Sequence, residues 1–176
     1  MNDSPTNTTG TTNTTGTTGA TALDLAGLTH DGRKPAFDVV EFLKRPLVAH
    51  LATWKPETAC DSPLWFHHDG RDLWFISANR GDTFPDKVRQ APNAAVGIVD
   101  FDKPTGRFLH LGFRGIARPH PWDADTAIAL LSKYLGSDRA GWDPRFADAP
   151  ESRTNVFVRF TPRSFVARDQ SFQVGG

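Results

Sequence analysis

Residues 47–102 decide the fold of this chain, and they read LVAHLATWKPETACDSPLWFHHDGRDLWFISANRGDTFPDKVRQAPNAAVGIVDFD. The stretch alternates short runs rich in β-branched and aromatic residues with tight turns, which is typical of consecutive strands. We expect four strands and one short helix here, the strands at residues 47–54, 59–67, 72–77 and 94–101 and the helix at 85–91. Both faces of the first strand are mostly apolar, which predicts burial on both sides.

The turn residues fix where these elements end. Pro63 cannot donate a ladder hydrogen bond, so the second strand should lie at a sheet edge or contain a bulge. The Asp69-Gly70 pair is a hairpin signal between the second and third strands. Pro85 suits the first turn of the short helix, Thr83 or Asp82 suits its cap, and Pro92 should end it.

The remainder of the chain adds two strands and two helices. Asp38 can cap a helix at residues 39–44, and Asp123 can begin a longer amphipathic helix that ends before Gly136. The expected strands cover residues 107–118, in which Gly112 and Gly115 mark bends or close backbone approach, and residues 155–161, continuing at 164–168. Residues 137–152 read as a polar loop. Six strands with few helices predict an α+β, mainly β protein built as a closed six-stranded antiparallel β-barrel.

Composition divides the chain into three parts. Residues 1–22 are almost entirely Thr, Asn and Gly, so we expect a disordered tail, followed by one domain at 23–170 and a short tail at 171–176. The 20 basic and 20 acidic residues balance, which argues against nucleic acid as a partner. No apolar run approaches the roughly 20 residues that cross a bilayer, so no membrane segment is expected. A single cysteine, Cys60, and no signal peptide predict a cytoplasmic protein.

Four segments resemble one known family. They are SPLWF followed by LWFIS in the second and third expected strands, the basic helix before Pro92 with its apolar strand behind, residues 112–117, and VFVRFTP near the C-terminus. In order and spacing they resemble the pyridoxamine 5'-phosphate oxidase-like family of flavin-binding split β-barrels, over about residues 39–168. The resemblance implies a homodimer with FMN in a groove between the subunits.

The resemblance also implies which residues meet the cofactor. The SPLWF strand would lie along the isoalloxazine ring, which assigns cofactor contacts to Ser62, Pro63, Leu64, Trp65 and Phe66.

The phosphate site departs from the family pattern. The family has an adjacent Arg-Lys pair that falls on Thr83-Phe84 here, so one hydroxyl donor remains and both charges are lost. Ser77 suits the ribityl chain or phosphate, and Arg80 or Lys87 is expected to replace the missing cation. Losing one charged contact costs about 1.5–3 kcal/mol, so FMN binding is predicted to be weakened unless another basic residue compensates.

On the fifth expected strand, His110 stands where the family's larger oxidases have a glutamine, and it can still donate a hydrogen bond. A partly buried strand histidine is the alternative interpretation. Arg114 shares a face with His110 and Gly112 by strand alternation, where it would meet a phosphate, the substrate or solvent. Adjacent His67 and His68 point to opposite faces of a strand, so no metal site is expected.

Three functions remain open. The first is an FMN-dependent oxidoreductase that transfers hydride to an unidentified small molecule, with no catalytic side chain identified. The second keeps the fold but uses a deazaflavin coenzyme, or haem with His50, His67 or His110 as axial ligand. The third is a non-enzymatic binding protein that has lost FMN. Vitamin B6 oxidation is not expected, because the chain ends in SFQVGG without the family's basic, tryptophan-bearing C-terminal segment.

Overall fold

The computed structural model of the chain describes residues 28–30, 35–55, 57–78 and 83–175. The N-terminal tail expected to be disordered and the candidate phosphate residue Arg80 therefore lie outside the described residues. The strands are β1 (Thr29–His30), β2 (Ala49–Lys55), β3 (Thr58–Leu64), β4 (His67–His68), β5 (Leu73–Ala78), β6 (Asn93–Asp102), β7 (Arg107–His120) and β8 (Asn155–Asp169). The helices are α1 (Val39–Lys44), α2 (Phe84–Gln90), α3 (Ala124–Leu135), the 3-10 turn η2 (Arg139–Gly141) and α4 (Pro144–Ala147).

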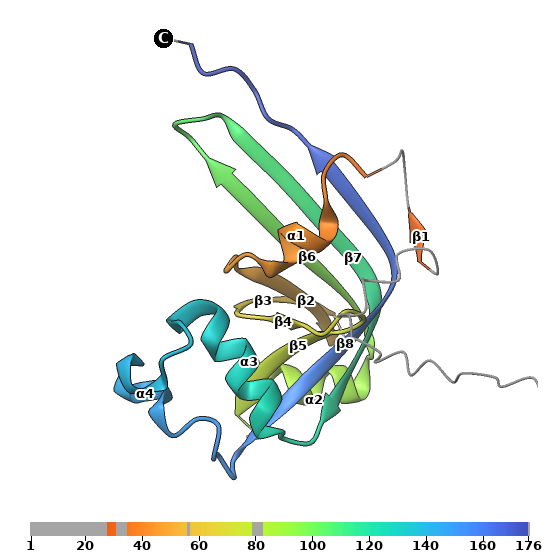
Figure 1. Cartoon of the computed structure of the whole chain (residues 1–176). Coiled ribbons are helices and arrows are strands. Elements are labelled where there is room, and N and C mark those ends of the chain that lie inside the picture. The colour runs from red at the N-terminus through yellow and green to blue at the C-terminus, as the bar shows by residue number, and fades with distance from the viewer. Residues whose placement is uncertain (1–27, 31–34, 56, 79–82, 176) are drawn as a thin grey trace, which may run out of the picture.

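The strands form one eight-stranded sheet in the order β3-β2-β6-β7-β8-β5-β4, with β1 added to β8. All neighbours are antiparallel except β1 and β8. Figure 1 shows β6, β7 and β8 as long strands running together, with α3 and α4 grouped at one side. The mainly β class is confirmed, but the expectation of six strands is wrong. The second expected strand ends at Leu64 and resumes as β4, and β1 was not expected.

The expected barrel closure is not confirmed. The hydrogen-bonded path through the described strands ends at β3 on one side and β4 on the other. Trp65 and Phe66 join these two end strands covalently, so the sheet turns back on itself through the chain. As predicted for a strand that contains Pro63, β3 lies at an edge of the sheet.

Local signals place the helices where the sequence predicted them. The Asp38 carboxylate accepts hydrogen bonds from the backbone N–H groups of Val40 and Glu41, at 2.9 and 3.1 Å, and so caps α1. Asp123 caps α3 in the same way, and Gly136, with φ of 90°, ends it. The loop expected at residues 137–152 contains the short elements η2 and α4, which the sequence did not reveal.

Strand β2 corrects one expectation directly, because only one of its faces is buried. Ala49, Leu51 and Thr53 face the core, whereas Ala52 and Trp54 are exposed, Trp54 by 52%. We call the solvent-facing side of strands β3, β2, β6, β7 and β8 the outer face. Apolar composition on both sides of β2 therefore indicates a surface that can be covered by something other than this subunit's own core.

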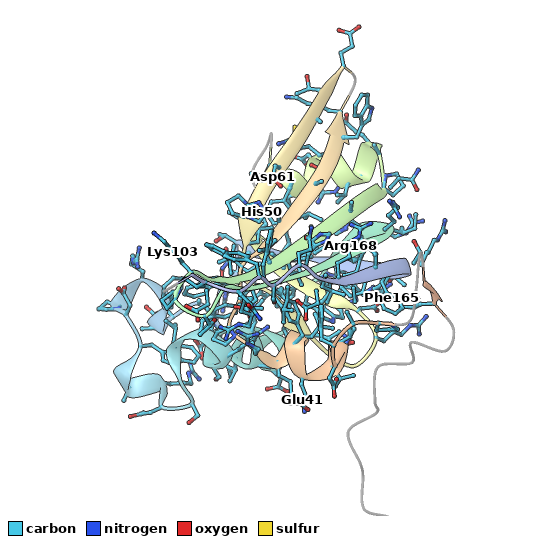
Figure 2. The ribbon with its side chains drawn as sticks, turned by 90° about the horizontal axis from the view of Figure 1, so that it is seen from above. Glu41, His50, Asp61, Lys103, Phe165 and Arg168 are labelled. Atoms are coloured by element: carbon cyan, nitrogen blue, oxygen red, sulfur yellow. The ribbon has the colours of Figure 1, made fainter. Side chains whose placement is uncertain are left out.

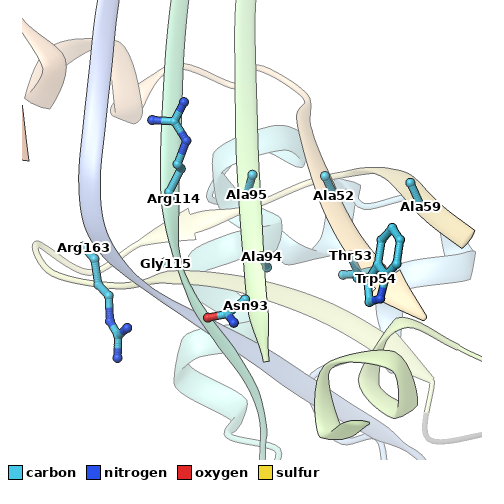
Figure 3. Close-up of a pocket in the computed structure, with 10 residues that line it drawn as sticks. All are labelled: Ala52, Thr53, Trp54, Ala59, Asn93, Ala94, Ala95, Arg114, Gly115 and Arg163. Carbon is cyan, nitrogen blue, oxygen red and sulfur yellow. The ribbon is translucent and has the colours of Figure 1, made fainter. Parts of the chain in front are cut away.

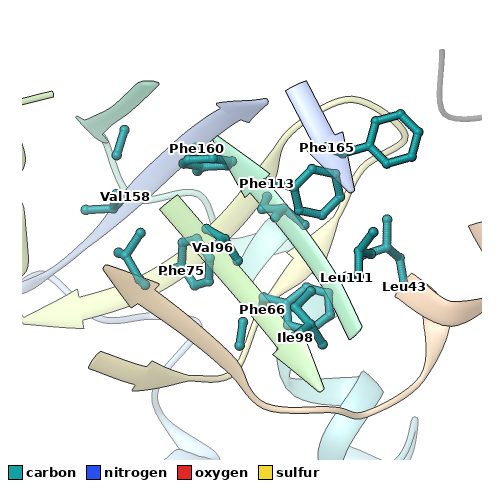
Figure 4. Packing of buried hydrophobic residues seen from close by; sticks show 14 of the residues in the cluster. Leu43, Phe66, Phe75, Val96, Ile98, Leu111, Phe113, Val158, Phe160 and Phe165 are labelled. Carbon is teal, nitrogen blue, oxygen red and sulfur yellow. The ribbon is translucent and has the colours of Figure 1, made fainter. Parts of the chain in front are cut away.

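The inner side of the sheet holds the main hydrophobic core. Its largest fully buried members are aromatic, among them Phe66, Phe75 and Phe160 (Figure 4). Helix α1 packs into this core through its buried residues Val39, Phe42 and Leu43. A second cluster joins α3 to the other side of β8, where Phe157 is fully buried.

A β-bulge interrupts the pairing of β7 with β8. Arg114 pairs with Ser164, but the next residue, Gly115, pairs with Pro162, so Arg163 is an extra residue in β8. A Cβ atom on Gly115 would lie 2.2 Å from the carbonyl oxygen of Thr161. The predicted close backbone approach at Gly115 is thus confirmed, and the bulge turns Arg163 toward the outer face beside Ser164.

Within the described part of the chain, none of the helices combines the length and the apolarity that crossing a membrane requires.

Candidate functional site

A shallow groove crosses the outer face, and we call it the outer-face groove. It consists of two adjoining hollows of about 490 and 330 Å³ that share Ala52, Ala95 and Arg114. The first hollow is lined by Ala52, Thr53, Trp54, Ala59, Asn93, Ala94, Ala95, Arg114, Gly115 and Arg163 (Figure 3). The second is lined by His50, Ala52, Asp61, Ala95, Val96, Gly97, His110, Gly112, Phe113, Arg114, Val166 and Arg168.

The floor of the groove is made of small residues in register. Ala52 pairs with Ala95 across β2 and β6, and Gly97 pairs with Gly112 across β6 and β7. A Cβ atom added to Gly97 would meet nothing within 4 Å, so the space above this glycine is open. Gly112 is partly covered, because an added Cβ atom would lie 3.2 Å from Cε1 of His110. The flat surface above Ala52, Ala95 and Gly97 suits a planar group lying against the backbone.

Two groups of polar residues flank the glycine floor. On the β2–β3 side, Nδ1 of His50 lies 2.8 Å from Oδ2 of Asp61, and both side chains are more than half exposed. On the β7–β8 side lie His110, Arg114 and Arg168, with His110 and Arg168 directly opposite each other. Figure 2 shows His50, Asp61 and Arg168 on the same face.

Electrostatics in the groove favour anions on the β7–β8 side. Partial burial, and secondly the charge of Arg168, lower the pKa of His110. At neutral pH the two arginines therefore supply the positive charge, and His110 is a neutral hydrogen-bonding group.

The opposite end of the groove is bordered by Trp54, Asn93 and Arg163. Figure 3 shows Arg114 and Arg163 extending from neighbouring strands in opposite directions. The hydroxyl oxygen of Thr53 is buried, and it makes no hydrogen bond to any described residue. The groove thus combines an aromatic edge, a small-residue floor and separated cations.

A third hollow, of about 400 Å³, lies beside α2 and is lined by Lys55, Asp86, Lys87, Arg89 and Gln90. Arg89 is paired with Asp86. The Lys87 ammonium makes no ion pair with any of the described residues. Because Trp54 lines the outer-face groove and Lys55 lines this hollow, adjacent residues of β2 link the two.

Of the phosphate residues expected from the resemblance, Lys87 lines this third hollow. Thr83 occupies the N-cap position of α2, although its side chain makes no capping hydrogen bond. Ser77, at the end of β5, is 8% exposed, and its hydroxyl donates to the carbonyl oxygen of Ala78 at 3.3 Å. These placements leave the phosphate assignment as a prediction.

The five residues of the SPLWF strand do not share one environment. Pro63, Leu64 and Trp65 line a fourth pocket, of about 410 Å³, against α3 and α4. Trp65 stacks on Tyr134 with ring centres 4.6 Å apart and planes 3° apart. The Phe66 side chain is fully buried in the core, and Ser62 pairs with Leu51 at the sheet edge. Cofactor contact by these residues stays a prediction.

Sequence reasoning missed the contact between His50 and Asp61. The signal was available in the register, since a turn that pairs Lys55 with Thr58 places Ala52 opposite Asp61. His50 then lies two residues farther along β2. Alternation then puts His50 and Asp61 diagonally on one face. Arg163 was missed because a bulge, not alternation, brings it to the groove. No three His, Cys, Asp or Glu side chains gather as a metal site in the described ranges.

Comparisons with known proteins identify the fold. A scan of protein-family models and a search of curated proteins found no match. A solved structure described as an F420 reductase is 26% identical, with a TM-score of 0.51, and covers 71% of this chain and 93% of its own. A candidate pyridoxamine 5'-phosphate oxidase from Listeria innocua is 20% identical, with a TM-score of 0.52, over 75% of this chain and 94% of its own.

Two further solved structures are named for the flavin or haem that they bind or store. An FAD-binding protein from Mesorhizobium loti is 20% identical, with a TM-score of 0.56, over 77% of this chain and 96% of its own. A haem storage protein from Vibrio cholerae is 13% identical, with a TM-score of 0.53, over 69% of this chain and 85% of its own. The resemblance to the pyridoxamine 5'-phosphate oxidase-like fold is therefore confirmed, and proteins with this fold include reductases, flavin-binding proteins and a haem storage protein.

Proposed function

We propose that this protein is an FMN-dependent oxidoreductase that binds its cofactor in the outer-face groove and transfers hydride to a small molecule. The observation that carries the proposal is the small-residue floor, open above Gly97 and flanked by His50 and Asp61 on one side and by basic residues on the other. A described F420 reductase and an FAD-binding protein with this fold support a cofactor of the flavin type.

The residues of the groove fit such a cofactor. A flavin needs a flat surface for its ring and charge-assisted donors for its phosphate. The small-residue floor meets the first need, and Lys87 with Thr83 and Ser77 would meet the second. Along β6, the groove runs from Asn93 to Val96 and Gly97, a length of about 13 Å at about 3.3 Å per residue. This length suits an elongated cofactor with its phosphate toward α2.

A second copy of the chain would complete the site. Four apolar side chains of the outer face are exposed. They are Val48, just before β2, by 44%, Trp54 on β2 by 52%, and Val99 and Phe101 on β6 by 43% and 56%. Exposed apolar side chains in such number mark an interaction surface. We propose that two subunits associate through their outer faces and enclose the groove between them.

Bound FMN would supply the hydride-transfer chemistry. The chain's own residues would bind and orient the cofactor. Lys87 and the β7–β8 arginines offset its negative charge, and Trp54 covers one edge of the floor. A partner subunit against Val99 and Phe101 would exclude water from the groove.

Fluorescence titration of the purified protein with FMN tests the proposal. We expect saturable quenching of flavin fluorescence, and Lys87→Gln should weaken affinity about tenfold to a hundredfold, as loss of one charged phosphate contact does. Lys103→Gln, an exposed lysine on the turn between β6 and β7, is the matched control. A wild-type protein that neither co-purifies with flavin nor binds added FMN would exclude this function.

A deazaflavin coenzyme is the second candidate. The separated cations Arg114, Arg163 and Arg168 would suit the longer anionic tail of such a coenzyme, and the F420 reductase supports it. Parallel titrations with F420, FMN and haem distinguish the cofactors. Tighter binding of F420 than FMN, with loss on Arg163→Gln, would favour the deazaflavin. Binding of none would favour a protein without cofactor.

A further inference from the structure

We propose that His50 is the proton donor of the outer-face groove and that Asp61 is its positioning residue. The inference rests on the proposed function, because it assigns an acid–base role within the same groove. His50 and Asp61 come from neighbouring strands, contact each other at 2.8 Å, and both line the groove. Neither residue belongs to the set that the family resemblance implied.

The contact between His50 and Asp61 determines which ring nitrogen faces the groove. An ionised carboxylate only accepts hydrogen bonds, so the Nδ1 atom facing Asp61 carries a hydrogen. Nε2 is then the atom through which the ring gains and loses its proton. The same contact holds the ring in place, so that Nε2 can act as a proton donor toward a ligand in the groove.

The position of His50 on the sheet gives Nε2 room to act. His50 pairs with Gly97, above which the space is open, and Gly97 pairs in turn with Gly112, beside which the His110 ring lies. The two strand spacings from β2 to β7 amount to about 10 Å, enough for a planar ligand between the two rims.

The residues that face His50 belong to four strands of the sheet, and three of these strands contribute charged side chains. Asp61 on β3 is the negative group, β6 contributes uncharged Ala95 and Gly97, and the cations stand on the far rim. Those cations are Arg114 on β7 and Arg168 on β8, and neutral His110 lies with them on β7. A substrate that develops negative charge on oxygen would therefore lie between a proton donor and fixed positive charges.

This arrangement fits reduction of a conjugated carbonyl compound or a quinone, which consumes one hydride and one proton. The hydride, supplied by the reduced flavin, brings both electrons and one hydrogen and leaves an anion with its charge on oxygen. His50 gives its Nε2 proton to that oxygen, forming an O–H bond. The neutral ring then takes a proton from water, which restores the starting state.

Anaerobic stopped-flow mixing of the FMN-loaded, reduced protein with menadione tests this role. The wild-type rate should fall as pH rises, because the step consumes a proton. His50→Gln, loaded with FMN, should react about a hundredfold more slowly at low pH, and with little pH dependence. His120→Gln changes a histidine outside the groove and should match the wild type.

A second measurement does not depend on activity. In the cofactor-free protein, nitrogen NMR should find neutral His50 protonated on Nδ1, and Asp61→Ala should abolish that preference. A His50→Gln protein with the wild-type rate and pH profile, or a His50 ring protonated on Nε2 alone, overturns the inference while leaving FMN binding intact. If the wild-type protein binds no FMN, the proposed function fails, and the proton-donor role fails with it.

Discussion

The ammonium group of Lys133 lies 3.4 Å from the centre of the Phe66 ring, and no carboxylate among the described residues forms an ion pair with it. It donates hydrogen bonds to the carbonyl oxygens of Leu43, at 2.9 Å, and Phe66, at 3.3 Å. The next residue, Tyr134, donates to the Leu47 carbonyl at 2.7 Å and accepts from the Phe66 N–H at 3.1 Å. Together, Lys133 and Tyr134 attach α3 to the break between β3 and β4.

Lys133 should make stability depend on pH. Burial lowers its pKa from 10.5 to about 7, so between these values the unfolded chain binds a proton that the folded chain does not. Stability should therefore rise with pH from about 7 to 10, by at most about 1.4 kcal/mol per pH unit. Urea unfolding of wild type and Lys133→Met across this range measures the difference.

The exposed Lys103→Met variant is the control for that comparison, and it should follow the wild-type pH dependence. If the stability difference between wild type and Lys133→Met is constant from pH 7 to 10, Lys133 stays charged in the folded protein and the prediction is wrong.

His68 should destabilise the protein in acid. Burial is the main cause that lowers its pKa to about 4, and its Nε2 atom is buried without a hydrogen-bond partner among the described residues. Between about pH 6.5 and 4, His68 binds a proton in the unfolded state but not in the folded state. The free energy of unfolding therefore falls as pH falls. His68→Gln should flatten this part of the profile, measured by thermal unfolding, and His120→Gln should leave it in place.

Gly115 should not tolerate a side chain. A Cβ atom there would lie 2.2 Å from the Thr161 carbonyl oxygen and 3.0 Å from Cα of Pro162, both in backbone that cannot move independently. Gly115→Ala should lower the free energy of unfolding by about 1–3 kcal/mol. Gly141→Ala adds a Cβ with nothing within 4 Å and should change stability by less than about 0.5 kcal/mol. Equal effects in urea titrations would contradict the steric argument.

The proposed dimer should depend on the apolar residues of β6. Val99→Ser with Phe101→Ser removes two exposed apolar side chains from the outer face, so association should weaken without loss of the core. Sedimentation velocity should show a dimer for wild type and for Asp148→Ser, an exposed change at the end of α4. The double variant should sediment as a monomer. A wild-type monomer at all concentrations would exclude the dimer.

Local signals predicted most of the fold. Caps such as Asp38 and Asp123, and the turn at Asp69-Gly70, act over a few residues, so they can be recognised in one sequence. The break at Trp65-Phe66 could not be predicted, because it results from the packing of Phe66 in the core and of Trp65 on Tyr134 of α3. The burial of β2 was misjudged because composition does not show whether an apolar face meets its own core or a partner.

The candidate site was less predictable than the fold. His110 and Arg114 were placed on one face correctly because alternation is a local property of a strand. The approach of His50 to Asp61 depends on the register of a hairpin whose turn carries no strong signal, and Arg163 depends on a bulge. Both are decided by pairing between strands.

The extra residue in β8 makes codon 163 a position where the chain can change in length as well as in identity. Pro162 and Ser164 already pair with the adjacent residues Gly115 and Arg114, so loss of Arg163 would leave a regular ladder. Phe165 and Ala167 would stay in the core, and Val166 and Arg168 would keep their partners on β7. Across evolution, we expect both the identity of this residue and its presence to vary.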